Sequence, residues 1–131
     1  MKRRMIALMF LLFVPLLSAC GGQATNNDEE MISLVEKFQT ARNEGNWDLA
    51  ASYLAEDVVW DTPTGSVTGR DNWLDSVGVV PGIREDVQNR RVEGNKVIVE
   101  MIVTGPDFES PAMAEVIVEN GKIQRYTVTP P

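Results

Sequence analysis

The sequence predicts an α+β domain in which three N-terminal helices pack on one face of a curved antiparallel sheet. Up to Leu54, apolar residues recur at a helical period, whereas from Arg84 onward apolar and polar residues alternate as they do in strands. The dipeptide Asn120–Gly121 is also a strong signal for a two-residue β-hairpin turn. Helices followed by strands that are joined by tight turns are typical of this fold class.

The first nineteen residues have the composition of an export signal. A basic start at Lys2–Arg4 precedes an apolar run over residues 5–17, which is short for a helix that must span a hydrocarbon core ~30 Å thick. The run ends in Leu17-Ser18-Ala19-Cys20, which is similar to the lipobox of bacterial lipoproteins. This resemblance implies cleavage before Cys20, diacylglycerol on its thiol, and a further acyl chain such as palmitate on the new amine. Since Cys20 is the only cysteine, no intramolecular disulfide can form.

We therefore expect a cleaved signal peptide at residues 1–19, a lipid-anchored flexible linker at residues 20–27 and a folded domain at residues 28–131. Two or three acyl chains anchor a protein firmly to a bilayer. The expected location is the cell membrane or the outer membrane, on the extracytoplasmic face of the cell envelope.

The net charge excludes one class of partner. The signal peptide holds 3 of the 12 basic side chains and no acidic one, so the remainder has 9 basic and 19 acidic side chains, a balance of −10. Such a balance argues against binding to nucleic acid and against adhesion to anionic lipid by charge alone. Its simplest role is to keep the domain soluble.

The first two helices are separated by a glycine. Residues 28–44 form one apolar stripe at helical spacing, made of Met31, Leu34, Val35, Phe38 and Ala41. Gly45 supplies the left-handed residue that ends a helix, and Asn46 caps the next one. That second helix has one apolar face, made of Trp47, Ala50, Ala51 and Leu54. We expect it to close at Glu56–Asp57.

Short elements follow. Residues 58–61 are β-branched or aromatic and predict a strand, residues 62–65 have the chemistry of a turn, and residues 67–68 suit a second short strand. Gly69 then precedes a two-turn helix at residues 70–77.

Four strands are predicted beyond Gly82, at residues 84–93, 96–104, 112–119 and 122–129, with a loop at residues 105–111. The second and third of these strands are apolar on both faces, apart from Glu100 and Glu115. A sheet that is apolar on both sides needs cover on its second face. We therefore expect a homodimer.

The stretch from Gly45 to Trp73 resembles the start of SnoaL-like members of the nuclear transport factor 2-like superfamily. The shared features are the G-N-W-D turn, the strand around Ala55–Val59 and the Gly69–Asp71 turn that opens a helix; the later Asn120–Tyr126 is similar to a hairpin of the same family. The resemblance implies a cone-shaped fold with an apolar pocket. The family includes polyketide cyclases, ketosteroid isomerases, epoxide hydrolases, dehydratases and non-catalytic modules, so the fold does not select a function.

Candidate catalytic groups are carboxylates, because the chain has no histidine and an acid or base in the pocket must then be Asp or Glu. The candidates are Glu100, Glu115 and Asp61. If the faces that carry Glu100 and Glu115 point into the cone, these side chains are buried and can share a proton or pair with a nearby arginine (Arg90, Arg91 or Arg125). If the faces point outward, the carboxylates are solvated or salt-bridged.

Four residues are candidates for ligand binding. Trp60 and Asp61 occupy positions where the resemblance implies an aromatic and an acidic residue facing the pocket, and Trp73 and Tyr126 are further candidates. SnoaL-type cyclases carry a catalytic aspartate on or after the last strands, but no acidic residue follows Arg125 here. Cyclase activity therefore cannot be transferred to this chain by resemblance.

We favour a lipid-anchored, non-catalytic domain that binds a small hydrophobic ligand or an envelope partner. The alternatives are an isomerase, cyclase or dehydratase that uses a pocket carboxylate, and a structural dimerisation module. No cofactor, metal or nucleic acid is expected.

Overall fold

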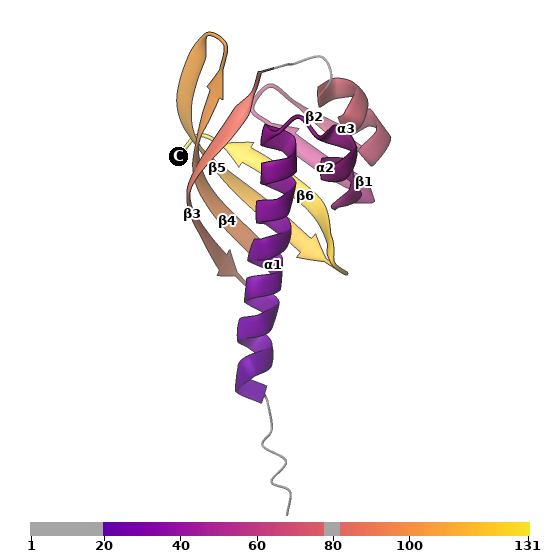
Figure 1. The fold of residues 1–131 in the computed structure, drawn as a ribbon, viewed down its shortest axis with the longest axis vertical. Coiled ribbons are helices and arrows are strands. Elements are labelled where there is room, and N and C mark those ends of the chain that lie inside the picture. Colours follow the sequence, from indigo (N-terminus) through magenta and orange to yellow (C-terminus); the bar gives the residue numbers. More distant parts are fainter. Residues whose placement is uncertain (1–19, 78–81) are drawn as a thin grey trace, which may run out of the picture.

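The computed structural model describes residues 20–77 and 82–131. The predicted signal peptide and most of the break before Gly82 lie outside the described residues. The helices described are α1 (Cys20–Asn43), α2 (Trp47–Ser52) and α3 (Arg70–Val77). The strands are β1 (Leu54–Thr62), β2 (Gly65–Thr68), β3 (Arg84–Glu93), β4 (Lys96–Gly105), β5 (Phe108–Glu119) and β6 (Lys122–Thr129). Figure 1 shows α1 crossing in front of the sheet.

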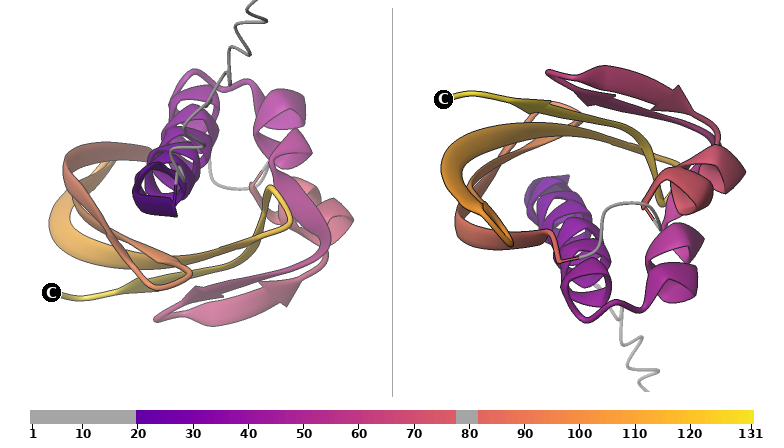
Figure 2. Two further views of the ribbon diagram at one scale, coloured as in Figure 1. Left: turned by 90° about the horizontal axis from the view of Figure 1, so that it is seen from below. Right: turned by 90° about the horizontal axis from the view of Figure 1, so that it is seen from above.

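The sheet curves around α1. Figure 2 shows α1 on its concave side, with α2 and α3 beside β1. The strand order is β2-β1-β6-β5-β4-β3. All neighbouring strands are antiparallel except β1 and β6, which run parallel with Trp60 opposite Tyr126. The expectation of a purely antiparallel sheet is therefore wrong at this pair. Two parallel neighbouring strands need a long crossover connection, and here the whole chain between the end of β1 and the start of β6 forms that connection.

The strands that follow Gly82 agree closely with the sequence pattern. The bounds of β3 and β6 are those predicted, and β4 is one residue longer. Asn120 has φ 53° and Gly121 has φ 70°. Positive φ at both central positions is what a type I′ hairpin turn requires, so the turn predicted from this dipeptide is confirmed.

The largest differences from the predicted boundaries are three. Glu56–Asp57 belongs to β1 rather than to the end of α2, because Leu54 already pairs with Ile123 of β6. Residues 108–111, expected in a loop, pair with β4 as the start of β5. The expected linker at residues 20–27 is helical, since α1 begins at Cys20; extending an existing helix adds a hydrogen bond per residue without a new nucleation cost.

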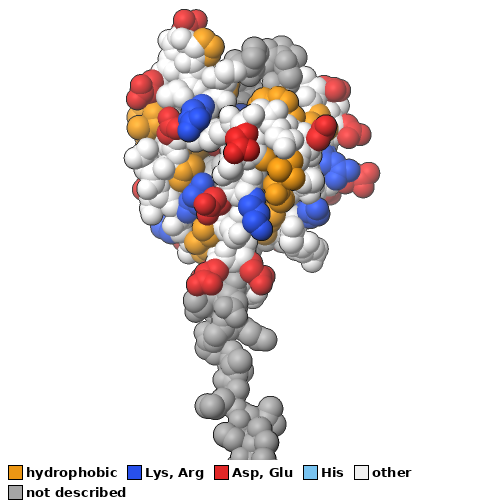
Figure 3. Space-filling view, viewed as in Figure 1, with side chains coloured by type: hydrophobic (Ala, Val, Ile, Leu, Met, Phe, Trp, Pro, Cys, Tyr) orange, Lys and Arg blue, Asp and Glu red, His pale blue; other side chains and the backbone are white. Residues whose placement is uncertain are grey.

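The core lies between α1 and the concave face of the sheet. It is built from aliphatic residues of β4, β5 and β6 together with Phe38, Trp60, Trp73 and Tyr126. On the surface seen in Figure 3, by contrast, acidic and basic side chains are interspersed among apolar ones. No helix within residues 20–77 and 82–131 has the length and apolar character needed to cross a membrane.

Candidate functional site

A cluster of polar side chains lies inside the otherwise apolar interior. Gln39 and Arg42 come from α1, Glu85 from β3 and Tyr126 from β6. Gln39 is 1% exposed, Glu85 is 3% exposed and Tyr126 is fully buried. We call these four residues the interior polar cluster.

The cluster is held together around the Glu85 carboxylate. The Tyr126 hydroxyl donates to Oε2 of Glu85 at 2.6 Å, and Nε2 of Gln39 donates to the same oxygen at 3.0 Å. Nε2 of Gln39 also donates to the Tyr126 hydroxyl oxygen at 3.0 Å. Nη1 of Arg42 forms an ion pair with Oε1 of Glu85. The carboxylate therefore accepts hydrogen bonds from three side chains.

Neighbouring residues fix the orientation of the cluster. Asn43 donates from Nδ2 to the Glu85 carbonyl at 2.8 Å and accepts from the Glu85 N–H at 2.9 Å, so it brackets the main chain of Glu85. Nε and Nη2 of Arg90 both donate to Oε1 of Gln39, at 3.0 and 2.9 Å. Since the Gln39 oxygen faces Arg90, its NH2 group faces Glu85 and Tyr126.

Tyr126 acts in this cluster as a neutral donor. Burial raises the pKa of its phenol well above the ordinary value of 10.0, and the neighbouring charge of Glu85 raises it further. The phenol therefore keeps its proton over the physiological pH range.

Aromatic rings surround the cluster on its apolar side. The ring of Trp60 stacks on Tyr126, with centroids 4.2 Å apart and planes 9° apart. Phe38 lies 5.9 Å from Trp60 and 5.6 Å from Trp73, and Trp60 lies 5.7 Å from Trp73. The guanidinium of Arg42 sits 5.0 Å from the centre of the Trp60 ring, within range of a cation–π interaction.

The structure thus brings together three of the four predicted ligand-binding residues, namely Trp60, Trp73 and Tyr126. Their role in ligand binding stays a prediction. Asp61 lies apart from them at the surface, where it accepts from Ser66 Oγ at 2.6 Å and from Arg125 Nε at 2.9 Å. The hydrogen bond from Ser66 lowers the pKa of Asp61 below its ordinary value of 3.8; burial opposes this effect, and the hydrogen bond and charge of Arg125 lower the pKa further.

Glu100 and Glu115 lie on the outer face of the sheet. Their side chains are 49% and 50% exposed, and they face Arg91 at 3.5 Å and Lys96 at 3.8 Å. Of the two orientations considered from the sequence, the outward one holds, so these residues do not form a buried carboxylate pair. Their expected partner Arg90 instead lies beside Gln39.

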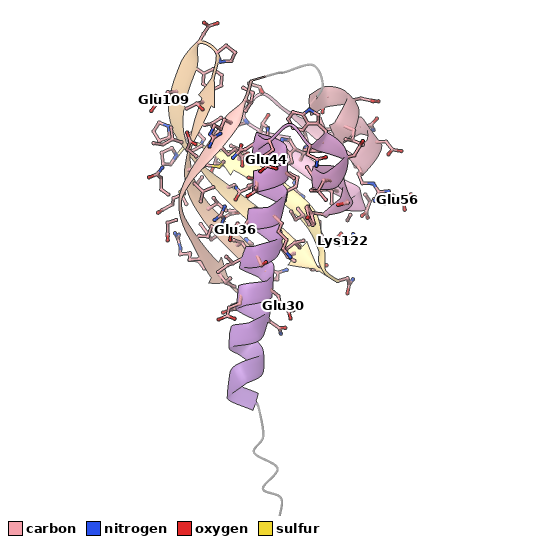
Figure 4. The ribbon with its side chains drawn as sticks, in the orientation of Figure 1. Glu30, Glu36, Glu44, Glu56, Glu109 and Lys122 are labelled. Atoms are coloured by element: carbon pink, nitrogen blue, oxygen red, sulfur yellow. The ribbon has the colours of Figure 1, made fainter. Side chains whose placement is uncertain are left out.

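The acidic side chains labelled in Figure 4 are also at the surface. All of them are exposed: Glu30, Glu36 and Glu44 on α1, Glu56 on β1 and Glu109 on β5. Within residues 20–77 and 82–131, no group of three or more metal-ligating side chains is arranged to hold an ion. Glu85 is therefore the one buried carboxylate in the described part of the chain.

A groove of about 450 Å³ opens beside the cluster, between the second half of α1 and β3. Gln39 and Glu85 contribute to its wall together with Asn43 and Arg90. The cluster thus lies at the boundary between this polar groove and the aromatic interior. Chemically, Glu85 is a carboxylate with three of its roughly four acceptor positions occupied, and Tyr126 is a hydrogen-bond donor.

Sequence reasoning missed Gln39, Arg42 and Glu85. For Gln39 and Arg42 the sequence contains one indication of an inward position. Gln39 directly follows Phe38 of the apolar stripe, and Arg42 lies one helical turn after Gln39. Glu85 had no such signal, because it begins a strand in which its neighbours are also charged.

A curved mixed sheet wrapped around a long helix defines the cone-shaped nuclear transport factor 2-like class of fold. A model of the SnoaL-like domain family matches residues 35–126, so the chain belongs to the SnoaL-like domain family. No curated protein sequence matches the chain significantly.

Solved structures agree with this fold. A nuclear transport factor 2-like protein of unknown function from Cytophaga hutchinsonii is 22% identical, with a TM-score of 0.72 over 76% of this chain and 88% of that one. A candidate ketosteroid isomerase from Kribbella flavida is 25% identical, with a TM-score of 0.72 over 80% and 84%. A candidate polyketide cyclase from Xanthomonas campestris is 26% identical, with a TM-score of 0.66 over 78% and 90%. A shared fold of this kind does not select one activity.

Proposed function

We propose that this chain is a lipid-anchored extracytoplasmic domain that binds a small apolar ligand at partly buried apolar residues beside its core, without transforming it. The observation that carries the ligand is the set of apolar residues that stay partly exposed where they pack against the buried core. Trp47 lies 6.3 Å from Trp73, and further partly buried residues pack against the same core, among them Leu74, Val103 and Val128. A ligand that covers this surface gains hydrophobic stabilisation.

The lack of catalysis is supported by the state of Glu85. A general base must come within hydrogen-bond reach of the proton that it takes, but the oxygens of Glu85 face Gln39, Arg42 and Tyr126, which occupy three of its roughly four acceptor positions. The remaining candidates, Asp61, Glu100 and Glu115, are at the surface.

One observation favours the enzymatic alternative. The Tyr126 hydroxyl and the Glu85 carboxylate are 2.6 Å apart in the interior, and two structural relatives are described as a candidate isomerase and a candidate cyclase. In that case Glu85, rather than Glu100 or Glu115, is the base. A turnover that is lost in Glu85→Gln and kept in Glu115→Gln would establish it.

Binding is tested with the neutral fluorescent probe N-phenyl-1-naphthylamine, added to the domain without its signal peptide. We expect saturable enhancement of the probe and energy transfer from the tryptophans, because all three lie around the core. Phe108→Ala is the matched control, since Phe108 is the most exposed large apolar residue described, at 49%. Non-saturable binding, or binding that is lost in Phe108→Ala, contradicts the proposal.

The lipid anchor rests on the tetrapeptide that ends at Cys20. It predicts that the mature N-terminus carries diacylglycerol and an additional acyl chain, detectable by mass spectrometry of the membrane fraction. Cys20→Ser is expected to leave an uncleaved, unlipidated chain. An unmodified Cys20 in the wild-type protein refutes the anchor.

The homodimer is proposed through the outer face of the sheet. Ile102, Met113 and Ile117 are partly exposed there, beside the salt-bridged Glu100 and Glu115. Met113→Glu would place a second carboxylate opposite Glu100, so we expect a shift from dimer to monomer in light scattering. Ser110→Glu, at an exposed position near the start of β5, is the control. If the wild-type protein is a monomer in light scattering, the proposal of a homodimer is contradicted.

A further inference from the structure

A groove of about 1000 Å³ lies beside the N-terminal half of α1. Its other walls are Tyr53, which follows α2, and the turns that join β3 to β4 and β5 to β6. In Figure 1 both turns lie at the lower end of the sheet, where α1 continues past it. We call this hollow the α1–turn groove; its volume is at the upper end of the range in which proteins bind small molecules.

The inner wall of the α1–turn groove is apolar. Met31, Leu34 and Tyr53 line the groove and are only partly buried, and Val118 of β5 lines it at 9% exposed. The first three belong to the set of partly buried apolar residues that pack against the core. A ligand whose apolar body covers them gains hydrophobic stabilisation.

Carboxylates surround this apolar wall. Four exposed acidic residues and one exposed lysine line the groove, namely Asp28, Glu29, Glu30, Glu119 and Lys37. Among the residues that the structure describes, none of these four carboxylates forms an ion pair. Lys122, which lies opposite Glu119 in the β5–β6 hairpin, donates instead to the Ser52 carbonyl at 2.6 Å.

The outer face of the sheet carries its charge differently. There Glu100 lies 3.5 Å from Arg91 and Glu115 lies 3.8 Å from Lys96, so each of these carboxylates has a basic partner. In the α1–turn groove the negative charge is left largely unbalanced. A concave surface lined by one sign of charge attracts ligands of the opposite sign.

We infer that the α1–turn groove is where the ligand binds and that the ligand is an apolar amine, a small molecule with one cationic group. Its apolar body covers Met31, Leu34 and Tyr53, and its ammonium group stays at the rim, near Glu30 and Glu119. This inference rests on the proposed function and specifies both the place and the chemical class of the ligand.

The test compares three ligands that share one alkyl chain: decylamine, decanol and decanoate. At neutral pH the first is positively charged, the second uncharged and the third negatively charged. Each is used to displace N-phenyl-1-naphthylamine from the same domain as in the probe experiment. We expect decylamine to bind about tenfold more tightly than decanol, because several carboxylates attract its ammonium group, and decanoate to bind more weakly than decanol.

Two double variants separate the groove from the overall charge of the protein. Glu30→Gln with Glu119→Gln removes two groove carboxylates and should weaken decylamine about fivefold without changing decanol. Glu56→Gln with Glu109→Gln is the matched control, because it changes the net charge equally at exposed positions that do not line the groove. It should change the affinity for decylamine by less than about twofold, since distant exposed charges are screened by salt.

Two single variants locate the two parts of the ligand. Lys37→Gln removes the lysine that lines the groove, so it should strengthen decylamine and weaken decanoate, a gain that partial unfolding does not produce. Met31→Ala removes apolar surface from the inner wall and should weaken decylamine and decanol by the same factor.

Each outcome supports or overturns the inference. If decylamine and decanol bind equally to the wild type, the inference is overturned while the proposed ligand binding stands. Equal effects of the two double variants, or no gain in Lys37→Gln, also overturn it, because the preference for a cation then comes from the overall charge. If neither the probe nor any of the three ligands binds, the proposed function fails and the inference fails with it.

Discussion

Glu85 and Glu115 lie on strands of one sheet but in opposite surroundings. Glu85 is 3% exposed and accepts from Gln39, Arg42 and Tyr126, whereas Glu115 is half exposed and lies 3.8 Å from Lys96. The local sequence suggests the reverse, since Glu115 interrupts an apolar run and Glu85 stands among charged residues. The comparison teaches that packing against α1, rather than the type of the neighbouring residues in the sequence, decides which carboxylate is buried.

Removal of Glu85 is expected to have the largest effect. Glu85→Ala leaves Arg42, whose side chain is 12% exposed, without its ion-pair partner, and breaking a buried pair costs about 3–5 kcal/mol of unfolding free energy. Glu115→Ala removes an exposed pair, worth less than about 1 kcal/mol. Urea unfolding monitored by tryptophan fluorescence measures both. Equal losses would erase the distinction between the two faces of the sheet.

Tyr126→Phe is expected to have an intermediate effect. It removes the hydroxyl that donates to Glu85 and accepts from Gln39, and leaves a buried partner unsatisfied at a cost of about 1–3 kcal/mol. The ring that stacks on Trp60 is kept, so the near-ultraviolet circular dichroism should change little. A loss of that signal would mean that the variant disrupts packing rather than a hydrogen bond.

The same residue predicts a dependence on alkaline pH. Because the folded pKa of Tyr126 is raised above 10.0, its contribution to stability is complete below the unfolded pKa and is lost as the pH rises through the folded value. The wild type should therefore lose unfolding free energy above pH 10, and Tyr126→Phe should lose less. Parallel pH profiles for the two proteins would exclude this linkage.

The smallest effect is expected at the surface ion pair of Asp61 and Arg125. Asp61→Asn should lower the unfolding free energy by less than about 1 kcal/mol at neutral pH. Since the folded pKa of Asp61 lies below 3.8, the stabilisation is present above that value and is lost as the pH falls through the folded pKa. The variant and the wild type should thus converge in acid, and a constant difference would assign the effect to another cause.

The sequence predicted the strands beyond Gly82 well, because each is bounded by a glycine turn. It failed where distant segments meet. A register shift between Val87 and Asn89 in β3 changes which residues face inward, so Val87 and Val92 both pack against the core although strict alternation puts them on opposite faces. Such a bulge has no clear local signature.

The candidate site was predicted in part. Trp60, Trp73 and Tyr126 were expected near a pocket and share one cluster. The sequence left both orientations open for Glu100 and Glu115 and did not indicate Glu85, because Glu85 reaches the interior only through β3–β4 pairing and contact with α1. These are long-range relations that no local pattern in one sequence encodes.

The parallel pairing of β1 with β6 has a consequence for how the chain folds. β6 lies between β1 and β5, so β1 and β2 are joined to the rest of the sheet through the strand that is made last. Contacts between segments so distant in sequence slow folding, since a long loop must close before they form. During synthesis, β1 therefore stays without its main partner until β6 has emerged, and a deletion of β6 would divide the sheet in two.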